Sequence, residues 1–252
     1  MPRDIDTLAW LVNRMVRCMA GSLRFARSKP FYRWQAWRHY AKVGTDSVPI
    51  VSIIAACTGI ILALQAASQL EKVGALSYVA NLVGVTIITE LGPLLTAIIL
   101  AGRSGAAFTA EIATMKISQE IDALEVIGID PIRFLVWPKM LSMIIMVPCL
   151  TAWGDFVGIF SGGLFSSLFL GLNARDYFEA TAAFLKVSDL ASGLVKSVAF
   201  GVTITVVGCW QGFLAREGAA DVGRRTTKSV VMSIFLIILL DLFFTSLNYI
   251  FL

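Results

Sequence analysis

The sequence predicts an all-α, polytopic integral membrane protein. The predicted elements are five transmembrane helices, an N-terminal interfacial amphipathic helix and a short cytoplasmic helix. The first observation is composition: of 252 residues, 57% are hydrophobic and 15% are charged, with a mean hydropathy of +0.78. Soluble domains have about 45–50% apolar and about 25% charged residues. The second observation is a series of apolar stretches of about 20 residues, the length that a helix needs to cross a bilayer core of about 30 Å.

The N-terminal region, residues 1–46, is predicted to lie on the membrane rather than cross it. Apolar residues recur there at steps of three and four, with arginines between them, as in a helix in the headgroup plane. The run from Phe31 to Arg38 mixes aromatic residues with arginine and resembles an interfacial anchor. A nucleic-acid patch is the alternative, which is disfavoured because the run leads directly into the first span.

The membrane domain, residues 47–252, is predicted to hold five spans at about 47–70, 78–110, 140–170, 190–215 and 229–252. Two of these stretches contain no charge except near their ends. The second contains Glu90 and Arg103, the third contains Asp155 and the last contains Asp241. An odd number of spans places the two termini on opposite sides of the membrane.

Basic residues give the orientation. The N-terminal region and the second and fourth connections, with their flanks, hold 17 Lys and Arg, against 4 in the other two connections. Cytoplasmic loops carry the excess of Lys and Arg. We therefore expect a cytoplasmic N-terminus and a C-terminus on the far side.

The segment 118–127, between spans two and three, is too short to cross the membrane and is predicted to be a cytoplasmic amphipathic helix. Ser118 is the expected N-cap, the acidic residues of the first turn match the helix dipole, and Gly128 with Pro131 ends the helix. Ile117, Ile121 and Leu124 share one face. Two interpretations remain, a helix on the bilayer surface and a docking element for a partner protein, and the exposed acidic residues Glu120, Asp122 and Glu125 favour docking.

Small residues recur at four-residue steps in three spans, which permits close helix packing. We expect most of them to pack within the chain and one stripe to serve a homodimer interface. The stripes are Ala55, Gly59, Ala63 and Ala67; Gly154, Gly158 and Gly162; and Gly193, Ser197, Gly201, Thr205, Gly208 and Gly212.

Polar residues inside spans are the candidate binding site, because ionisable groups in a bilayer are costly and usually functional. Gln65, Glu90 and Asp241 come from three different spans, and Lys196 is expected to open the fourth span on the outer side, where it would meet a phosphate. Such groups suit an apolar cavity that receives a polar head. No Gly-Lys dipeptide occurs, so a Walker A motif is absent, and the lone His39 and scattered cysteines leave no metal or cofactor site.

A longer pattern resembles a known family. The residues that carry it are Glu90, Gly92, Pro93, Gly102, Arg103, Gly105, Glu111, Gly128, Asp130 and Pro131. This pattern resembles the MlaE/YrbE permeases of ABC transporters. That family includes the permease of the Mla phospholipid system, which serves outer-membrane asymmetry, the permeases of mycobacterial Mce systems and a chloroplast lipid-precursor permease.

The resemblance implies a homodimer that moves phospholipid, or a related lipid, between the bacterial inner membrane and an MCE-domain partner, an MlaD-like hexamer. A separate MlaF-like ATPase would bind ATP and Mg, joined by an MlaB-like STAS-domain protein. The plastid inner envelope is a less favoured location, and an inner-membrane protein would have its C-terminus in the periplasm. Docking would involve Ser118, Glu120, Ile121, Asp122, Leu124 and Glu125. Lipid would bind near Gln65, Glu90, Lys196 and Asp241.

Two other classes of function remain. A secondary transporter would use Glu90 and Asp241 for ion coupling and would need no ATPase. A non-transporting scaffold would use the spans only to assemble a lipid-transport complex. One departure from the family concerns the headgroup: Thr89 stands where some members carry Arg, so the charge of the cavity differs.

Overall fold

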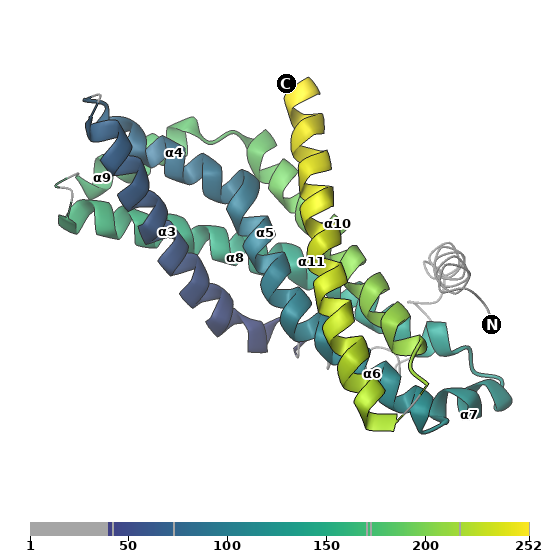
Figure 1. The fold of residues 1–252 in the computed structure, drawn as a ribbon. Coiled ribbons are helices and arrows are strands. Elements are labelled where there is room, and N and C mark those ends of the chain that lie inside the picture. Colours follow the sequence, from purple (N-terminus) through teal and green to yellow (C-terminus); the bar gives the residue numbers. More distant parts are fainter. Residues whose placement is uncertain are drawn as a thin grey trace.

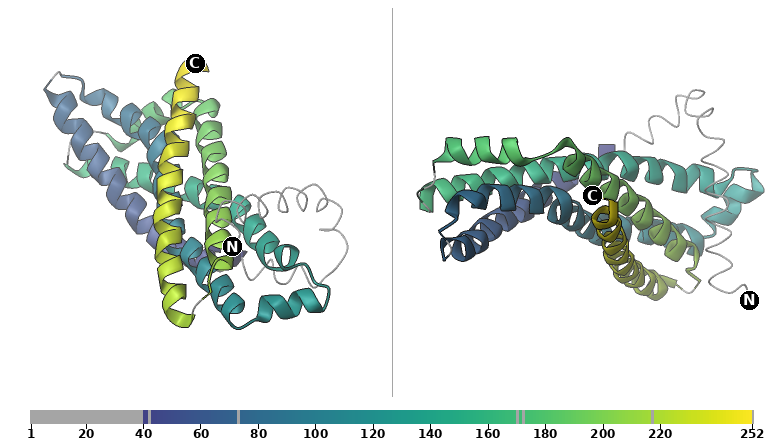
Figure 2. Two further views of the ribbon diagram at one scale, coloured as in Figure 1. Left: turned by 45° about the vertical axis from the view of Figure 1, so that its right-hand side comes forward. Right: turned by 90° about the horizontal axis from the view of Figure 1, so that it is seen from above.

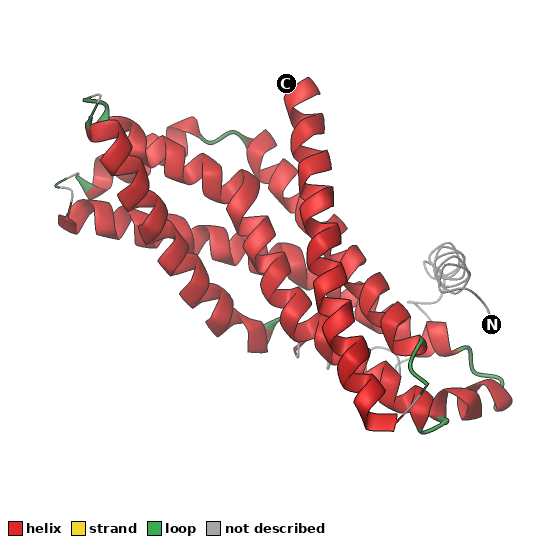
Figure 3. Ribbon diagram, viewed as in Figure 1, coloured by secondary structure: helices red, strands yellow, loops and turns green. Residues whose placement is uncertain are grey.

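The computed structural model describes residues 40–41, 43–72, 74–169, 171, 173–216 and 218–251. Every regular element in these ranges is a helix (Figure 3). Five helical stretches in the described part of the chain are long and apolar enough to cross a membrane, namely Thr45–Glu71, Val79–Ile117, Ile132–Phe169, Val187–Phe213 and Gly218–Ile250. The predicted fold class is confirmed. The predicted interfacial helix and its aromatic anchor lie outside the described residues.

The first span consists of the 3-10 turn η1 (Thr45–Ser47) and α3 (Val48–Glu71), and it packs along the third span, α8 (Trp137–Phe169). The contact is close because glycines face each other. A Cβ on Gly59 would overlap the carbonyl of Gly158, and one on Gly162 would lie 3.1 Å from the carbonyl of Gly59. The predicted stripes on these two spans therefore pack within the chain.

The second span is one helical rod with two wide turns. It runs from the 3-10 turn η2 (Leu76–Tyr78) through α4 (Val79–Thr86), the π-turn η3 (Ile87–Leu91), α5 (Gly92–Leu100), the π-turn η4 (Ala101–Gly105) and α6 (Ala106–Ile117). The helix continues to Ile117, beyond the predicted end of the span at residue 110. Pro93 does not break the helical rod, although it lacks a backbone N–H, because the π-turn before it changes the local hydrogen-bond pattern.

The cytoplasmic helix α7 (Glu120–Val126) is shorter than the predicted 118–127. Ser118 is not its N-cap, because Gln119 adopts a left-handed conformation with φ 61° and takes that position. The Ser118 hydroxyl instead lies 3.0 Å from the carbonyl of Thr114. The predicted stop is confirmed: Gly128 has φ 83°, and the amides of Gly128 and Ile129 bond back to Glu125 and Leu124 in a Schellman motif.

The third span begins with the π-turn η5 (Ile132–Val136), earlier than the predicted residue 140, and the Asp130 carboxylate accepts from the Ile132 amide at 3.1 Å. After α8 comes an amphipathic helix that the sequence analysis missed, α9 (Ala174–Phe184). Asn173 caps it by accepting from the Arg175 amide at 3.1 Å. An Asn followed by an acidic first turn was the available signal.

The fourth and fifth spans are α10 (Val187–Phe213) and α11 (Gly218–Phe251). The last helix starts at Gly218 rather than at the predicted residue 229. Its basic residues therefore belong to the helix, and Arg224 pairs with Asp221 at 2.6 Å. In Figures 1 and 2, α11 lies against α10, with α7 near its first turn and the C-terminus at the opposite end.

Candidate functional site

Lys196 is the centre of a polar cluster inside the bundle. It lies nine residues into α10, about 13 Å along the axis, rather than at its outer opening as predicted. Its side chain is 2% exposed. Its ammonium group donates to Glu90 Oε1 at 2.8 Å, to the Thr89 carbonyl at 3.1 Å and to Thr245 Oγ1 at 2.9 Å. These three bonds use all three N–H groups of the lysine.

Asp241 completes the cluster from α11. Its Oδ1 lies 3.1 Å from Lys196 Nζ, an ion pair without the direction of a hydrogen bond, and the side chain is 15% exposed. One turn further, the Thr245 hydroxyl lies 2.9 Å from Glu90 Oε1. The cluster therefore joins three spans: η3 of the second, α10 of the fourth and α11 of the fifth.

The π-turn before Pro93 explains one of the lysine contacts. In a regular helix the carbonyl of Thr89 would accept from the amide four residues later, but Pro93 has no N–H. Lys196 donates to this carbonyl instead. The same turn brings Glu90 toward α10, where Gly193 lets the helices approach, since a Cβ there would overlap the carbonyl of Ile88. Pro93 and Gly193 thus both allow Lys196 to reach the π-turn.

The cluster holds two acidic side chains for one basic side chain. With all three groups ionised, one ammonium and two carboxylates give a net charge of −1. Glu90 is its most accessible charged member, with 34% of its side chain exposed. A ligand that reaches the cluster would therefore meet a carboxylate first, and a cationic group would compensate the excess.

Gln65 does not join these residues. It is exposed on α3, and no hydrogen bond from it to Glu90, Lys196 or Asp241 occurs in the described part of the chain. The structure thus brings together three of the four predicted site residues. It also adds Thr245 and the Thr89 carbonyl, which the sequence analysis did not single out, although Thr245 lies one turn from Asp241 on the same helix face.

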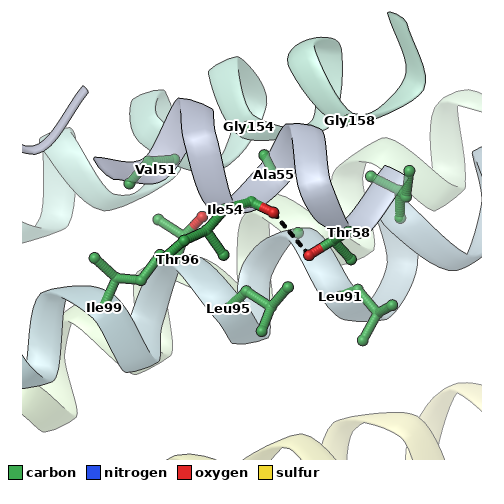
Figure 4. A pocket seen from close by; sticks show the side chains of 12 residues that line it. Val51, Ile54, Ala55, Thr58, Leu91, Leu95, Thr96, Ile99, Gly154 and Gly158 are labelled. Carbon is green, nitrogen blue, oxygen red and sulfur yellow. Dashed lines mark hydrogen bonds between the residues drawn. The ribbon is translucent and has the colours of Figure 1, made fainter. Parts of the chain in front are cut away.

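An apolar pocket adjoins the other side of the π-turn. It contains about 310 Å³ of empty space, part of it open to the outside. Figure 4 shows α3, α5 and α8 around it, with the Thr58 hydroxyl bonded to the Ile54 carbonyl at 2.8 Å. Ile87 and Leu91 line the pocket, while Glu90 between them reaches Lys196. The π-turn therefore stands between an apolar space and the charged cluster.

Other charged residues of the recognised motif hold the fold together. Arg103 donates to Ser47 Oγ at 2.6 Å and pairs with Asp46 at 3.3 Å, which fixes the start of the first span to the second π-turn. Lys139 is buried and pairs with Glu111 at 2.8 Å. Both pairs therefore have structural explanations.

The predicted docking residues divide into two groups on α7. Ile121 is buried in a core cluster, and Leu124 packs against that cluster, so both attach α7 to its own chain. The acidic residues are exposed, with Asp122 paired to Lys116 at 2.6 Å. The apolar side chains that face outward are Val126 and Ile127, which are 88% and 72% exposed. The sequence analysis did not select them.

Comparison with known proteins places the chain in a family. The family model described as Permease MlaE matches residues 36–247. A probable ABC transporter permease of Rickettsia typhi is 38% identical over 218 residues, which cover 86% of this chain and 84% of that protein. A probable ABC transporter permease of Synechocystis is 35% identical over 201 residues, covering 80% and 76%.

A plant protein extends the comparison. The chloroplastic protein TRIGALACTOSYLDIACYLGLYCEROL 1 of Arabidopsis thaliana is 30% identical over 224 residues, which cover 89% of this chain and 64% of that protein. The family match spans all five membrane helices, the two π-turns of the second span and the Lys196 cluster. From this match we conclude that the chain belongs to the MlaE permease family and is a multi-pass membrane subunit of the ABC permease type.

Proposed function

We propose that this chain is the lipid-conducting permease subunit of an ABC transporter. It moves phospholipid or a related lipid between the inner membrane and an MCE-domain partner, with energy from a separate ATPase subunit. The observation that carries the proposal is the Lys196 cluster: charged groups from three spans, inside a membrane domain, with one carboxylate accessible and an apolar pocket beside it. The name of the Arabidopsis relative refers to a glycerolipid, which supports a lipid substrate.

The headgroup preference follows from the charges. All three N–H groups of Lys196 are donated within the chain, so a phosphate would have to displace a carboxylate to reach them. Glu90 is accessible and belongs to a cluster in which two carboxyl groups face one ammonium group. We therefore expect a headgroup ammonium to approach Glu90, which favours zwitterionic lipids over purely anionic ones.

The proposal also calls for a second copy of the chain. The pocket, whose empty space of about 310 Å³ is partly open to the outside, is too small to enclose a lipid with two long chains. Further walls must come from another molecule. In a homodimer, two pockets and two Lys196 clusters would face a shared space, while an MlaD-like hexamer of MCE domains takes up the lipid outside.

Energy reaches the chain through α7 in this proposal. Val126 and Ile127 offer an apolar contact next to exposed Glu120 and Glu125, and the buried Ile121 fixes α7 to the core. An MlaF-like ATPase, together with an MlaB-like STAS-domain protein, would bind on this side. This requires the orientation given by the basic residues, with the C-terminus in the periplasm, and a reporter fused after Leu252 should be active only there.

Lipid transfer by the reconstituted complex tests the substrate. Purified complex in proteoliposomes should transfer labelled phospholipid with ATP, and Glu90→Gln should reduce transfer of a zwitterionic lipid at unchanged subunit stoichiometry. Glu71→Gln, at the exposed end of α3, is the matched control and should transfer normally. Equal transfer by both variants would remove Glu90 from the lipid site, and transfer without ATP would favour ion coupling.

Co-purification of the ATPase tests the docking surface. Val126→Asp places a charge in the apolar contact and should release the ATPase, because burying an unpaired charge is costly. The permease itself should stay folded, since Val126 is exposed. Leu124→Asp is the contrasting variant and should destabilise the permease, because Leu124 packs against the core. Full ATPase recovery with Val126→Asp would move the docking surface elsewhere.

A further inference from the structure

Asp155 is a buried carboxylate that the proposed function does not use. It lies near the middle of α8 and is 5% exposed. Its Oδ1 has no hydrogen-bond partner, and no ion pair to Asp155 occurs in the described ranges. The carboxylate rests against the first residue of α5: a Cβ on Gly92 would overlap Asp155 Oδ1. Glycine at position 92 therefore makes room for this side chain.

The elements packed against α8 supply no free cation. Four basic side chains occur on these elements and on α8 itself, and each has an acidic partner. Lys196 pairs with Glu90 and Asp241, Arg175 with Glu179, Arg133 with Asp130 and Lys139 with Glu111. The other titratable groups on these elements are acidic, phenolic or thiol: Glu71, Asp176, Asp189, Tyr177, Cys57, Cys149 and Cys209.

An ionised carboxylate without a partner is among the most costly groups in a membrane interior. A proton removes that cost, because it converts the side chain to a neutral acid. We propose that Asp155 is a proton-binding site of this protein, occupied when α5 and α8 pack as they do here. An O–H bond forms between a carboxylate oxygen and a proton taken from water, and the proton returns to water when the two helices separate.

Asp155 differs from the Lys196 cluster in its neighbours and in the role of a bound proton. In the Lys196 cluster, two carboxylates pair with one ammonium group, and both carboxylates belong to the proposed lipid site. Asp155 is far less exposed than Glu90 and touches the turn that begins α5 from the opposite helix. Loss of its proton would place a bare charge between α5 and α8, so proton binding is linked to the packing of these helices.

Infrared spectroscopy of the full-length chain in lipid nanodiscs tests the proposal without any transport assay. The wild type at neutral pH should show the C=O stretch of a protonated carboxylic acid, shifted in heavy water. Asp155→Asn should lack that band, while Glu90→Gln should keep it. Should the Asn variant fail to fold, Asp155→Glu serves instead and should keep an acid band at a shifted frequency.

Two outcomes would overturn the proposal. One is a wild-type spectrum without an acid band. A sodium ion bound to an ionised Asp155 would give this result, and sodium would then stabilise the wild type but not Asp155→Asn. The other is an acid band that survives unchanged in Asp155→Asn or keeps its frequency in Asp155→Glu. Neither outcome depends on lipid transfer, so the site and the proposed function can fail separately.

Discussion

The Lys196 cluster and Asp155 are two places where the same bundle carries charge inside the membrane, and they solve the cost differently. At Lys196, side chains from the second, fourth and fifth spans surround one ammonium group with two carboxylates, a hydroxyl and a carbonyl. At Asp155, the carboxylate faces a glycine, and its Oδ1 has no hydrogen-bond partner among the described residues. Charge in the first place is compensated by neighbours, and in the second only a bound proton can compensate it.

The two places also differ in how accessible their carboxylates are. The compensated cluster exposes a third of the Glu90 side chain and can therefore meet a ligand. The uncompensated carboxylate is almost fully enclosed, which prevents it from exchanging groups larger than a proton without helix movement. The charged partners of a carboxylate and its exposure therefore distinguish a ligand site from a site whose proton binding is linked to helix packing.

The largest effect should come from removing the shared cation. Lys196→Met keeps the length of the side chain but leaves Glu90 and Asp241 without their partner, and breaking a buried pair costs about 3–5 kcal/mol. Thermal unfolding in detergent should show a strong loss of stability. Adding Glu90→Gln and Asp241→Asn to the same chain should recover most of it. Wild-type stability of the single variant would contradict charge compensation.

A smaller effect is expected when the two aspartates are neutralised separately. Asp241→Asn removes one of the two carboxylates that pair with Lys196 and should cost more stability than Asp155→Asn, which replaces a neutral acid and should cost less than about 1 kcal/mol. The same unfolding measurement compares them. A greater loss at position 155 than at 241 would reverse the comparison.

The close contact between Gly92 and Asp155 can be tested by substituting the glycine. Gly92→Ala puts a methyl group where Asp155 Oδ1 lies and should destabilise the protein by about 1–3 kcal/mol, as overpacking does. Combining it with Asp155→Ala should restore part of the loss, because the clash is removed. Additive losses in the double variant would show that the two residues are not in contact in solution.

The smallest effect concerns the neutral member of the cluster. Thr245→Val removes a hydroxyl that contacts both Lys196 and Glu90 and should cost about 0.5–1.5 kcal/mol. Thr227→Val on the same helix is the control, since that exposed hydroxyl bonds only within its own turn. Equal stability of the two variants would mean that Thr245 adds nothing to the compensation at Lys196.

Several elements were predictable because their signals are local. The five spans follow from apolar length, and Gly128 ended α7 because glycine readily adopts the positive φ that closes a Schellman motif. Boundaries were less predictable. The second span continues as a helix to Ile117, and polar residues extend α11 back to Gly218, because helices do not stop where apolar residues stop.

The sequence by itself determined the membrane class, the number of spans and the presence of charged residues within them, since each depends on residues close together in the chain. Only the tertiary structure decided which charges are paired. Glu90 and Lys196 are 106 residues apart in sequence and meet through packing of different spans, while Asp155, equally conspicuous in sequence, meets no cation in the part of the chain that the structure describes. Packing also turned Ile121 inward and left Val126 outside, because only one face of a short helix can reach the core.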